Sequence, residues 1–294
     1  MKIHICYCTP LFICWFSLQE IYATQTPAIR KSTLVEKKME KEEEASQTAF
    51  SAVFYKQNYI LPFYYTTSPY SQVYQNNTPE NNIKKTEFSY QLSIKVPIWE
   101  NMFASRSSLY VAYTQLAFWQ AYNHLPFFRE TDFEPEIFVT YKMAKPVARG
   151  WSLDILQAGA VHASNGFGDS QERVWNRFYL EAAASSTHWM ISLRPWYVCR
   201  NSGYNKYNPD MAKYLGYGEA TLSYKFSQHV ITISGHGLFE EGGRYKTGVV
   251  TYTFPLSPHL NGLVRAFSGY GQSLIEYNHY TNGVGVGIAF NPSL

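Results

Sequence analysis

The stretch FSYQLSIKVPIW, residues 88–99, alternates between apolar and polar side chains with a period of two. Its even positions are apolar, from Phe88 to Ile98, and its odd positions are mostly polar, from Ser89 to Lys95. Successive side chains of a β-strand point to opposite faces, so the alternation predicts a strand with one apolar and one polar face. The same period returns in three later segments: 219–226, 250–256 and 284–294.

Alternating segments of about ten residues, separated by Asn, Gly, Pro and Ser turns, are typical of transmembrane β-barrels. Aromatic residues make up 17% of the chain, which suits the aromatic girdles of such barrels. Because lipid offers no hydrogen bonds, a spanning sheet has to close on itself. We therefore predict an all-β, antiparallel transmembrane barrel over residues 50–294, although the chain ends in Leu294 where such barrels usually end in an aromatic. A soluble β-sandwich, which also alternates, is the alternative.

The N-terminal region divides into two parts. Residues 1–23 have the features of a secretory signal peptide, with a basic start at Lys2 and an apolar stretch that follows it. A retained membrane anchor is the weaker alternative, because the apolar stretch is short and contains Pro10. Residues 24–49 mix charges of both signs without periodicity, so we interpret them as a charged, solvated extension in which a short helix can form.

Net charge and cysteine content bear on possible partners, disulfides and metal sites. The net charge of +3 is small for 294 residues and gives no reason to expect a nucleic-acid partner. Three of the four cysteines lie inside the predicted signal peptide, so the mature chain keeps only Cys199. This excludes an internal disulfide and a thiolate metal cluster in the mature chain.

The stretch VHASNGFGDSQERVWNRF, residues 161–178, places polar side chains in the apolar phase of a predicted hairpin. In its second strand the charged side chains point inward, and Asn176 falls in the outward, apolar set. If the glycine-rich turn is centred near Asp169, position 162 lies opposite position 176. His162 and Ser164 then share the outward face with Asn176, because all three have even parity.

One imidazole can bridge a hydroxyl two residues along its strand and an amide on the neighbouring strand. This is the arrangement of an activated serine nucleophile. An unpaired amide facing hydrocarbon costs on the order of several kcal/mol, so Asn176 needs a partner. From these residues alone a structural role is the alternative, in which the three are interface polar groups or His162 only hydrogen-bonds its neighbours.

The segment HASNGFGDSQERVWNRFY, residues 162–179, resembles the active-site hairpin of the outer-membrane phospholipase A family, whose pattern is H-x-S-N-G, then D, then W-N-R. The resemblance covers essentially everything after residue 50, in order. Further segments similar to the same family are YTQLAFWQ (113–120), PFFRETDFEP (126–135), RPWYV (194–198), NPDMAKYLGY (208–217), SGYGQSLIEYN (268–278) and GVGVGIAFN (283–291).

The resemblance implies a barrel of about twelve strands in the bacterial outer membrane that hydrolyses acyl esters of membrane phospholipids and lysophospholipids. It implies Ser164 as the nucleophile, His162 as the base and Asn176 as the residue that orients the imidazole. It also implies that the backbone N–H of Gly166 donates to the tetrahedral intermediate. A neutral asparagine suits a lipid-facing site, where an aspartate would add a buried charge. The alternative is a non-catalytic, porin-like or structural barrel with a degenerate hairpin.

The resemblance implies calcium (Ca2+) as well, with departures in its ligands. The family's carbonyl ligand aligns with Phe167, and its serine ligand aligns with Glu172, a harder and charged oxygen donor. Asp169 is a further candidate ligand. A serine that the family donates from the partner subunit aligns with Leu125 or Pro126, neither of which has a side-chain oxygen.

A reversible homodimer is the last implication of the resemblance. The family's interface contains a membrane-buried glutamine, which matches Gln115. By parity with Val111 and Trp119 this side chain faces lipid unless it is paired across an interface, and an inward-facing Gln115 is the alternative. We predict that the remaining charged residues form one interior network: Arg129, Glu130, Glu134, Arg177 and Glu181.

Overall fold

The computed structural model describes residues 31–46, 52–79, 81–102, 106–199, 206–237, 240–258 and 260–291. From Ser32 to the end the chain forms one unit. The predicted signal peptide, residues 1–23, and the chain end at Leu294 lie outside the described residues. Within the described ranges, every helix is too short or too polar to pass through a membrane.

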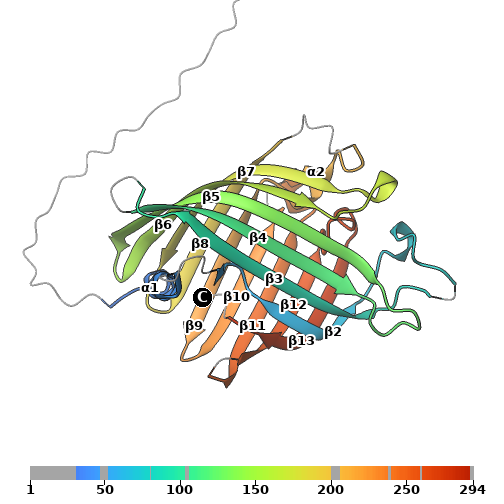
Figure 1. Ribbon diagram of the computed structural model, residues 1–294, viewed down its shortest axis with the longest axis horizontal. Helices are drawn as coiled ribbons and strands as arrows, with labels where there is room; N and C mark the ends of the chain where they lie inside the picture. Colours follow the sequence, from blue (N-terminus) through green and yellow to red (C-terminus); the bar gives the residue numbers. More distant parts are fainter. Residues whose placement is uncertain are drawn as a thin grey trace, which may run out of the picture. The chain divides into compact units, whose positions relative to one another are not determined.

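Strands dominate the described chain (Figure 1). In chain order the elements are α1 (Leu34–Ser46), β1 (Val53–Phe54), β2 (Tyr59–Thr66), the 3-10 helix η1 (Ser71–Val73), β3 (Thr86–Trp99), β4 (Ser107–Trp119), β5 (Phe128–Ala148), β6 (Trp151–Ser164), η3 (Asp169–Gln171), β7 (Val174–Ser185), β8 (Trp189–Val198), α2 (Met211–Leu215), β9 (Gly218–Phe226), β10 (His229–His236), η5 (Glu240–Gly243), β11 (Thr247–Ser257), β12 (Leu260–Gly269) and β13 (Thr281–Ala289).

The strands form one closed antiparallel sheet. From β2 to β13 each strand pairs with the next along the chain, and β13 pairs back onto β2, which leaves no open edge. Strands β1 and β2 lie one after the other along β3 and together make one interrupted strand of the wall. The result is a 12-strand barrel, which confirms the predicted fold class.

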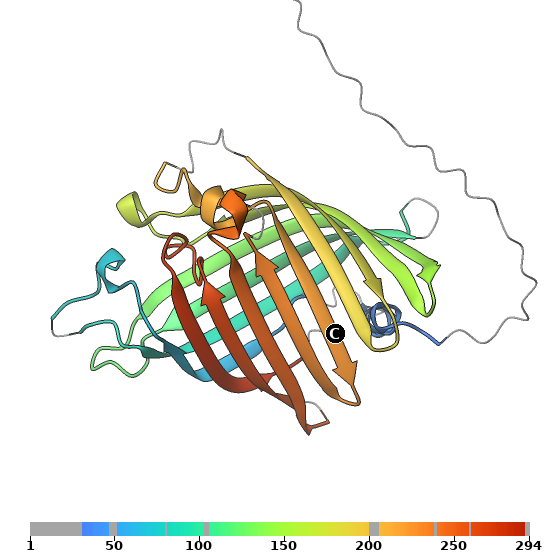
Figure 2. The same cartoon turned by 180° about the vertical axis from the view of Figure 1, so that it is seen from behind.

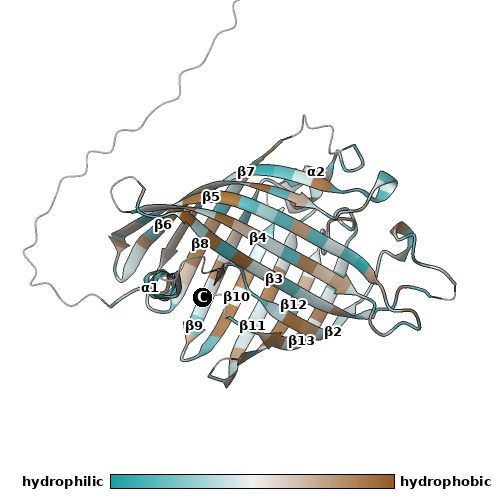
Figure 3. Cartoon of the chain, in the orientation of Figure 1, coloured by the Kyte–Doolittle hydropathy of each residue, from teal (hydrophilic) through white to brown (hydrophobic). Residues whose placement is uncertain are grey.

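The period-two alternation sorts side chains between lipid and lumen, as Figure 3 shows along the strands. On β3, Leu92 and Ile98 are 44% and 59% exposed, whereas Ser89 and Ser93 are buried. The same rule holds on the later strands, where Val250 is exposed on β11 next to a buried threonine. The apolar phase therefore faces outward, which is the orientation that a spanning barrel requires.

Connections alternate in length around the barrel, and Figure 2 shows the longer ones gathered at one end. The longer connections are 67–85, 120–127, 165–173, 199–217, 237–246 and 270–280. The shorter connections are 100–106, 149–150, 186–188, 227–228 and 258–259. Outer-membrane barrels have long extracellular loops and short periplasmic turns, so we assign the longer set to the outside of the cell.

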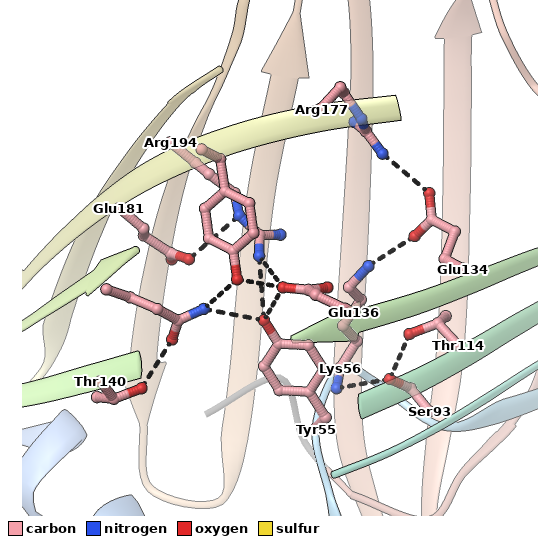
Figure 4. A network of polar contacts seen from close by, with 12 residues as sticks. Tyr55, Lys56, Ser93, Thr114, Glu134, Glu136, Thr140, Arg177, Glu181 and Arg194 are labelled. Carbon is pink, nitrogen blue, oxygen red and sulfur yellow. Dashed lines mark hydrogen bonds and ion pairs between the residues drawn. The ribbon is translucent and has the colours of Figure 1, made fainter. Parts of the chain in front are cut away.

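The lumen contains a group of ion pairs that joins opposite parts of the wall (Figure 4). Glu134 on β5 binds Lys56 at 2.8 Å and Arg177 on β7 at 3.2 Å. Arg194 on β8 lies 3.4 Å from Glu181 on β7. These residues confirm the predicted interior charges on β5 and β7.

Arg129 belongs to a second, separate group. Its guanidinium binds Glu87 at 2.7 Å and Glu276 at 3.3 Å, and all three side chains are almost fully buried. Glu130 accepts the backbone N–H of Ile275 at 3.0 Å in the same region. The prediction of one network is therefore wrong, because the extracellular connection 270–280 folds in and supplies separate partners at that end of the barrel.

Helix α1 contradicts the interpretation of the extension as solvated. Leu34 and Val35 are each only 5% exposed, and Thr33 donates to Asp154 on β6 at 3.2 Å. Thr33 and Glu36 exchange backbone N–H hydrogen bonds at the helix start, which forms a capping box. Two ion pairs, Lys95–Glu42 and Lys142–Glu43, bind the helix to β3 and β5, and Figure 1 shows it at the short-turn end.

Deletion of residues 32–46 is expected to turn a closed barrel into an ion-conducting one. The helix and the strands around it line a cavity of about 600 Å³, so removal of the helix would enlarge the water-filled space in the lumen. Single-channel current in planar lipid bilayers measures this. Alanine at the exposed Lys37 and Lys41 is the control and should leave the conductance low. An unchanged conductance after the deletion would contradict the role of α1 as a plug of the barrel.

Candidate active site

The hairpin of β6 and β7 brings two of the predicted residues into contact. His162 on β6 lies directly opposite Asn176 on β7, which is the register expected from the sequence. The imidazole Nδ1 lies 2.7 Å from Asn176 Oδ1. Since a carbonyl oxygen only accepts, Nδ1 carries the proton and Nε2 is left as the basic nitrogen.

Ser164 lies on the same outward face, at the end of β6. Its neighbours Val161 and Ala163 are 7% and 0% exposed and point inward, whereas His162 is exposed and Ser164 is partly exposed. Residues two apart on a strand are separated by roughly 6.5–7 Å, a gap that rotation of both side chains can close. Among the described residues, no hydrogen bond joins the Ser164 hydroxyl to His162.

Gly166 follows in the loop between the two strands. Its φ of +68° lies in the left-handed region, and a Cβ there would come within 3.0 Å of the Phe133 ring. Glycine is therefore required both for the backbone conformation and for the close approach of β5. Within the described chain no acceptor takes the Gly166 N–H, so this donor is available beside Ser164.

Asn165 and Arg173, which our sequence analysis did not single out, hold this loop together. Asn165 is 3% exposed, and its side chain bonds the backbone at Phe167, Gln171 and Arg173. Arg173 donates to the carbonyl oxygens of Ser170 at 2.9 Å and Glu172 at 2.7 Å. The Asn-Gly pair signals a turn, but strand parity says nothing about side chains inside a loop.

Comparison with known proteins gives the family. The sequence profile of the family "Phospholipase A1" matches residues 35–290. This chain belongs to the phospholipase A1 family. The family, the class of enzyme and the outer-membrane location expected from the sequence are thereby confirmed.

Individual relatives agree with this membership. A putative phospholipase A1 of Neisseria meningitidis serogroup B is 36% identical over 255 residues, which cover 79% of this chain and 63% of that relative. The outer membrane phospholipase A of Escherichia coli superposes with a TM-score of 0.77 at 30% identity, over 84% of this chain and 95% of that one. A calcium-bound dimer of the Salmonella typhi outer membrane phospholipase gives the same TM-score and identity, over 84% and 94%.

The predicted calcium residues of this phospholipase A1 family member surround η3. Asp169 begins that single turn with φ +54° and is exposed, and Glu172, which is partly buried, donates its N–H to the Asp169 carbonyl at 3.1 Å. Phe167 packs against an apolar cluster, which fixes its backbone. The predicted ligand atoms, the Phe167 carbonyl oxygen and the carboxylate oxygens of Asp169 and Glu172, are of the type that calcium prefers.

The calcium donors of one chain are few. Within the described ranges no group of three or more His, Cys, Asp or Glu side chains comes close enough to hold a metal. Calcium takes about six to eight oxygen ligands, so the remaining positions would fall to water, substrate or a second chain. Leu125 and Pro126 lie exposed in the connection between β4 and β5, and neither offers a side-chain oxygen.

Gln115 points outward, as predicted, on the face of β4 that also contains the exposed Val111. Its Nε2 donates to the Tyr90 hydroxyl at 2.8 Å, and its Oε1 accepts from the Tyr113 hydroxyl at 3.1 Å. Two tyrosines of the same chain, on β3 and β4, therefore satisfy this outward-facing amide, and pairing across an interface with a second chain stays a prediction. An inward-facing Gln115 is excluded.

The buried Tyr277 holds the connection 270–280 in place beside the site. Burial, and then the hydrogen bond to Asp210, raise the pKa of the Tyr277 hydroxyl above its ordinary value. The hydroxyl thus stays protonated and donates to Asp210 Oδ1 at 2.7 Å. The Arg173 guanidinium lies 5.7 Å from the centre of the Tyr277 ring, so this contact holds the connection 270–280 against the loop that contains Gly166.

Proposed function

We propose that this chain is a calcium-dependent phospholipase that hydrolyses acyl esters of membrane phospholipids and lysophospholipids with Ser164, His162 and Asn176. The observation that supports the proposal best is the 2.7 Å contact between His162 Nδ1 and Asn176 Oδ1 on the outer face of the barrel. Polar groups are costly at a lipid boundary, so a barrel wall that needed only stability would have apolar residues at both positions. On this outer face His162 and Asn176 are next to the acyl esters of the surrounding lipid leaflet.

The reaction proceeds in two displacements. Ser164 Oγ attacks the ester carbonyl carbon while His162 Nε2 takes its proton. The carbon–oxygen bond of the ester then breaks, and His162 returns the proton to the alcohol that leaves, which is a lysophospholipid when the substrate is a phospholipid and a glycerophosphodiester when it is a lysophospholipid. In the second displacement Nε2 takes a proton from a water molecule, which attacks the acyl-serine; the bond to Ser164 Oγ breaks, Oγ regains a proton from His162, and the fatty acid leaves. Asn176 keeps the imidazole in the tautomer and orientation that both steps need.

Negative charge develops on the carbonyl oxygen in each step. The N–H of Gly166, which has no acceptor within the described chain, would donate to this oxyanion. Bound calcium would add positive charge beside the same oxygen. The Phe167 carbonyl and the carboxylates of Glu172 and Asp169 would hold that ion, since all three belong to the loop that contains Gly166.

We infer that a homodimer forms through the outer face that contains Gln115, and this inference rests on the same proposal. Gln115 on β4 pairs with Phe133 on β5, and Phe133 pairs with Ser164 on β6. Neighbouring strands are about 4.8 Å apart, so the amide and the proposed nucleophile lie roughly 10 Å from each other on one outer face. A second copy bound at this face would contact both and would cover the ester-binding region.

A long-chain alkyl sulfonyl fluoride is expected to sulfonylate the purified protein at Ser164, with loss of fluoride, and to stop fatty-acid release from phospholipid–detergent micelles. The reagent reacts with an activated serine and spares unactivated hydroxyls. Peptide mass spectrometry locates the adduct, and release is followed by titration of the acid. An adduct at another serine, or none while release continues, would refute the proposed nucleophile. Protein unfolded by heat serves as the control and should stay unlabelled.

Alanine at Glu172 is expected to raise the calcium concentration for half-maximal activity by at least about tenfold, because loss of even indirect support for a metal costs about 10- to 100-fold in affinity. Calorimetric titration of the protein with calcium should show the same weakening without substrate. Glu40→Ala removes the same charge from an exposed position on α1 and should leave both measurements unchanged. Equal calcium titrations for the wild type and Glu172→Ala would remove this residue from the ligand set.

A further inference from the structure

Asn165, between Ser164 and Gly166, is the most constrained side chain of the loop at the proposed site. Its Oδ1 accepts the backbone N–H of Arg173 at 2.9 Å and that of Phe167 at 3.4 Å. Its Nδ2 donates to the carbonyl oxygen of Gln171 at 2.9 Å. The side chain is 3% exposed, so water cannot replace these bonds if they are lost.

These bonds connect the beginning and the end of the loop. The backbone N–H of Asn165 also donates to the Arg173 carbonyl at 3.2 Å, so residue 165 contacts residue 173 through both backbone and side chain. Gly166 lies between the anchored Asn165 and the anchored Phe167 N–H. The left-handed φ of Gly166, and with it the direction of its N–H, is therefore held from both sides.

The hydrogen bonds of Asn165 fix a backbone group that the proposed reaction uses. The Asn165 side chain is buried among backbone groups of the loop, whereas Gly166 next to it is exposed with an N–H that no described residue accepts. A donor to an oxyanion works only if its position is already set before charge develops, since reorganisation during the reaction costs rate. Misplacement of about 1 Å can lower the rate about 10²-fold.

We propose that Asn165 is a positioning residue for the reaction: it holds the Gly166 N–H where the oxyanion forms, without touching the substrate. This inference rests on the proposed function of Ser164 and Gly166. Loss of the Asn165 side chain should therefore lower kcat rather than raise KM, because the Gly166 N–H donates only when the carbonyl oxygen becomes negative.

Asn58 provides a matched control elsewhere in the barrel. It is 1% exposed, and its side chain also makes three hydrogen bonds to backbone groups, at Ser93 N, Ser93 O and Lys56 O. It joins the connection between β1 and β2 to β3, away from the β6–β7 hairpin. Asn58→Ala and Asn165→Ala therefore remove the same chemistry from equally buried positions, and only one of them lies beside the proposed oxyanion donor.

The experiment compares Asn165→Ala, Asn58→Ala and Ser164→Ala in full-length protein, with calcium in excess. We expect Asn165→Ala to lower kcat about 10²-fold with little change in KM, and to slow labelling by a long-chain alkyl sulfonyl fluoride. Asn58→Ala should lower the unfolding temperature by a similar amount and keep the wild-type kcat. Asn165→Asp keeps an acceptor for the two N–H groups and should recover part of the lost kcat, which also covers the case in which the alanine variant does not fold.

Each outcome decides one question. A kcat for Asn165→Ala equal to that of Asn58→Ala, or a loss that appears only in KM, would overturn the positioning role. Failure of Asn165→Asp to exceed the alanine variant in kcat, when both are folded, would also count against it. If Ser164→Ala remains active, the proposed function itself is wrong, and this result is distinct from the previous two.

Discussion

Alanine at position 164 is expected to abolish fatty-acid release, with a loss in kcat of at least about 10⁴-fold. Without the Ser164 hydroxyl no acyl-enzyme forms, and His162 has no proton to accept. Binding of phospholipid should persist, because the acyl chains contact the apolar outer face that the substitution leaves intact. The rate of acid release from mixed micelles, with and without calcium, measures the effect.

Two comparisons make this test specific. Ser268 on β12 is also an exposed serine, bound to Tyr280 and Asn282, and Ser268→Ala should retain wild-type release. Residues that act as a unit are not additive, so a double variant of Ser164 and His162 should be no slower than either single variant. A double variant that loses activity in two independent steps would show that the two residues do not work together. Release by Ser164→Ala at the wild-type rate would end the serine-hydrolase proposal.

Alanine at position 176 is expected to lower kcat by about 10²- to 10³-fold, less than the loss at Ser164. The imidazole would lose the acceptor that lies 2.7 Å from Nδ1 and would populate the tautomer that cannot take the serine proton. The hydroxyl and the base would both remain, so part of the activity survives. Steady-state kinetics should show the loss in kcat, with KM near the wild-type value.

Asn282 on β13 is the matched control for this substitution. It is an exposed asparagine that accepts a hydrogen bond from Ser268 at 2.7 Å, on a strand that does not pair with β6 or β7. Asn282→Ala should therefore leave kcat unchanged. An equal loss in the two variants, or no loss at Asn176, would mean that the contact with His162 is structural only.

Local periodicity accounts for what could be predicted. The alternation in residues 88–99 placed Leu92 outside and Ser93 inside before any pairing was known, because side-chain direction along a strand depends on the chain alone. The contact of His162 with Asn176 was within reach for the same reason. The two residues are only 14 positions apart in one hairpin, so parity and turn position determine their register. The strand number came from the family resemblance.

Contacts between distant segments account for what could not be predicted. Thr33 donates a hydrogen bond to Asp154, 121 residues later in the chain. This contact holds α1 against the barrel, whereas the charge pattern had predicted that this segment is solvated. Arg129 pairs with Glu276, 147 positions later in the numbering, so this partner could not be predicted from local spacing. Asn165 lies in a loop, where parity carries no information.

By itself the sequence determined the closed antiparallel barrel, the side of each strand that faces lipid and the face shared by Ser164, His162 and Asn176. These follow from a period of two and from one hairpin, both of which are local properties of the chain. Only the tertiary structure decided that α1 fills one end, that two separate charge groups occupy the lumen and that Asn165 holds the loop beside Gly166. Each of these depends on buried polar groups that must find hydrogen-bond partners wherever closure of the barrel brings them.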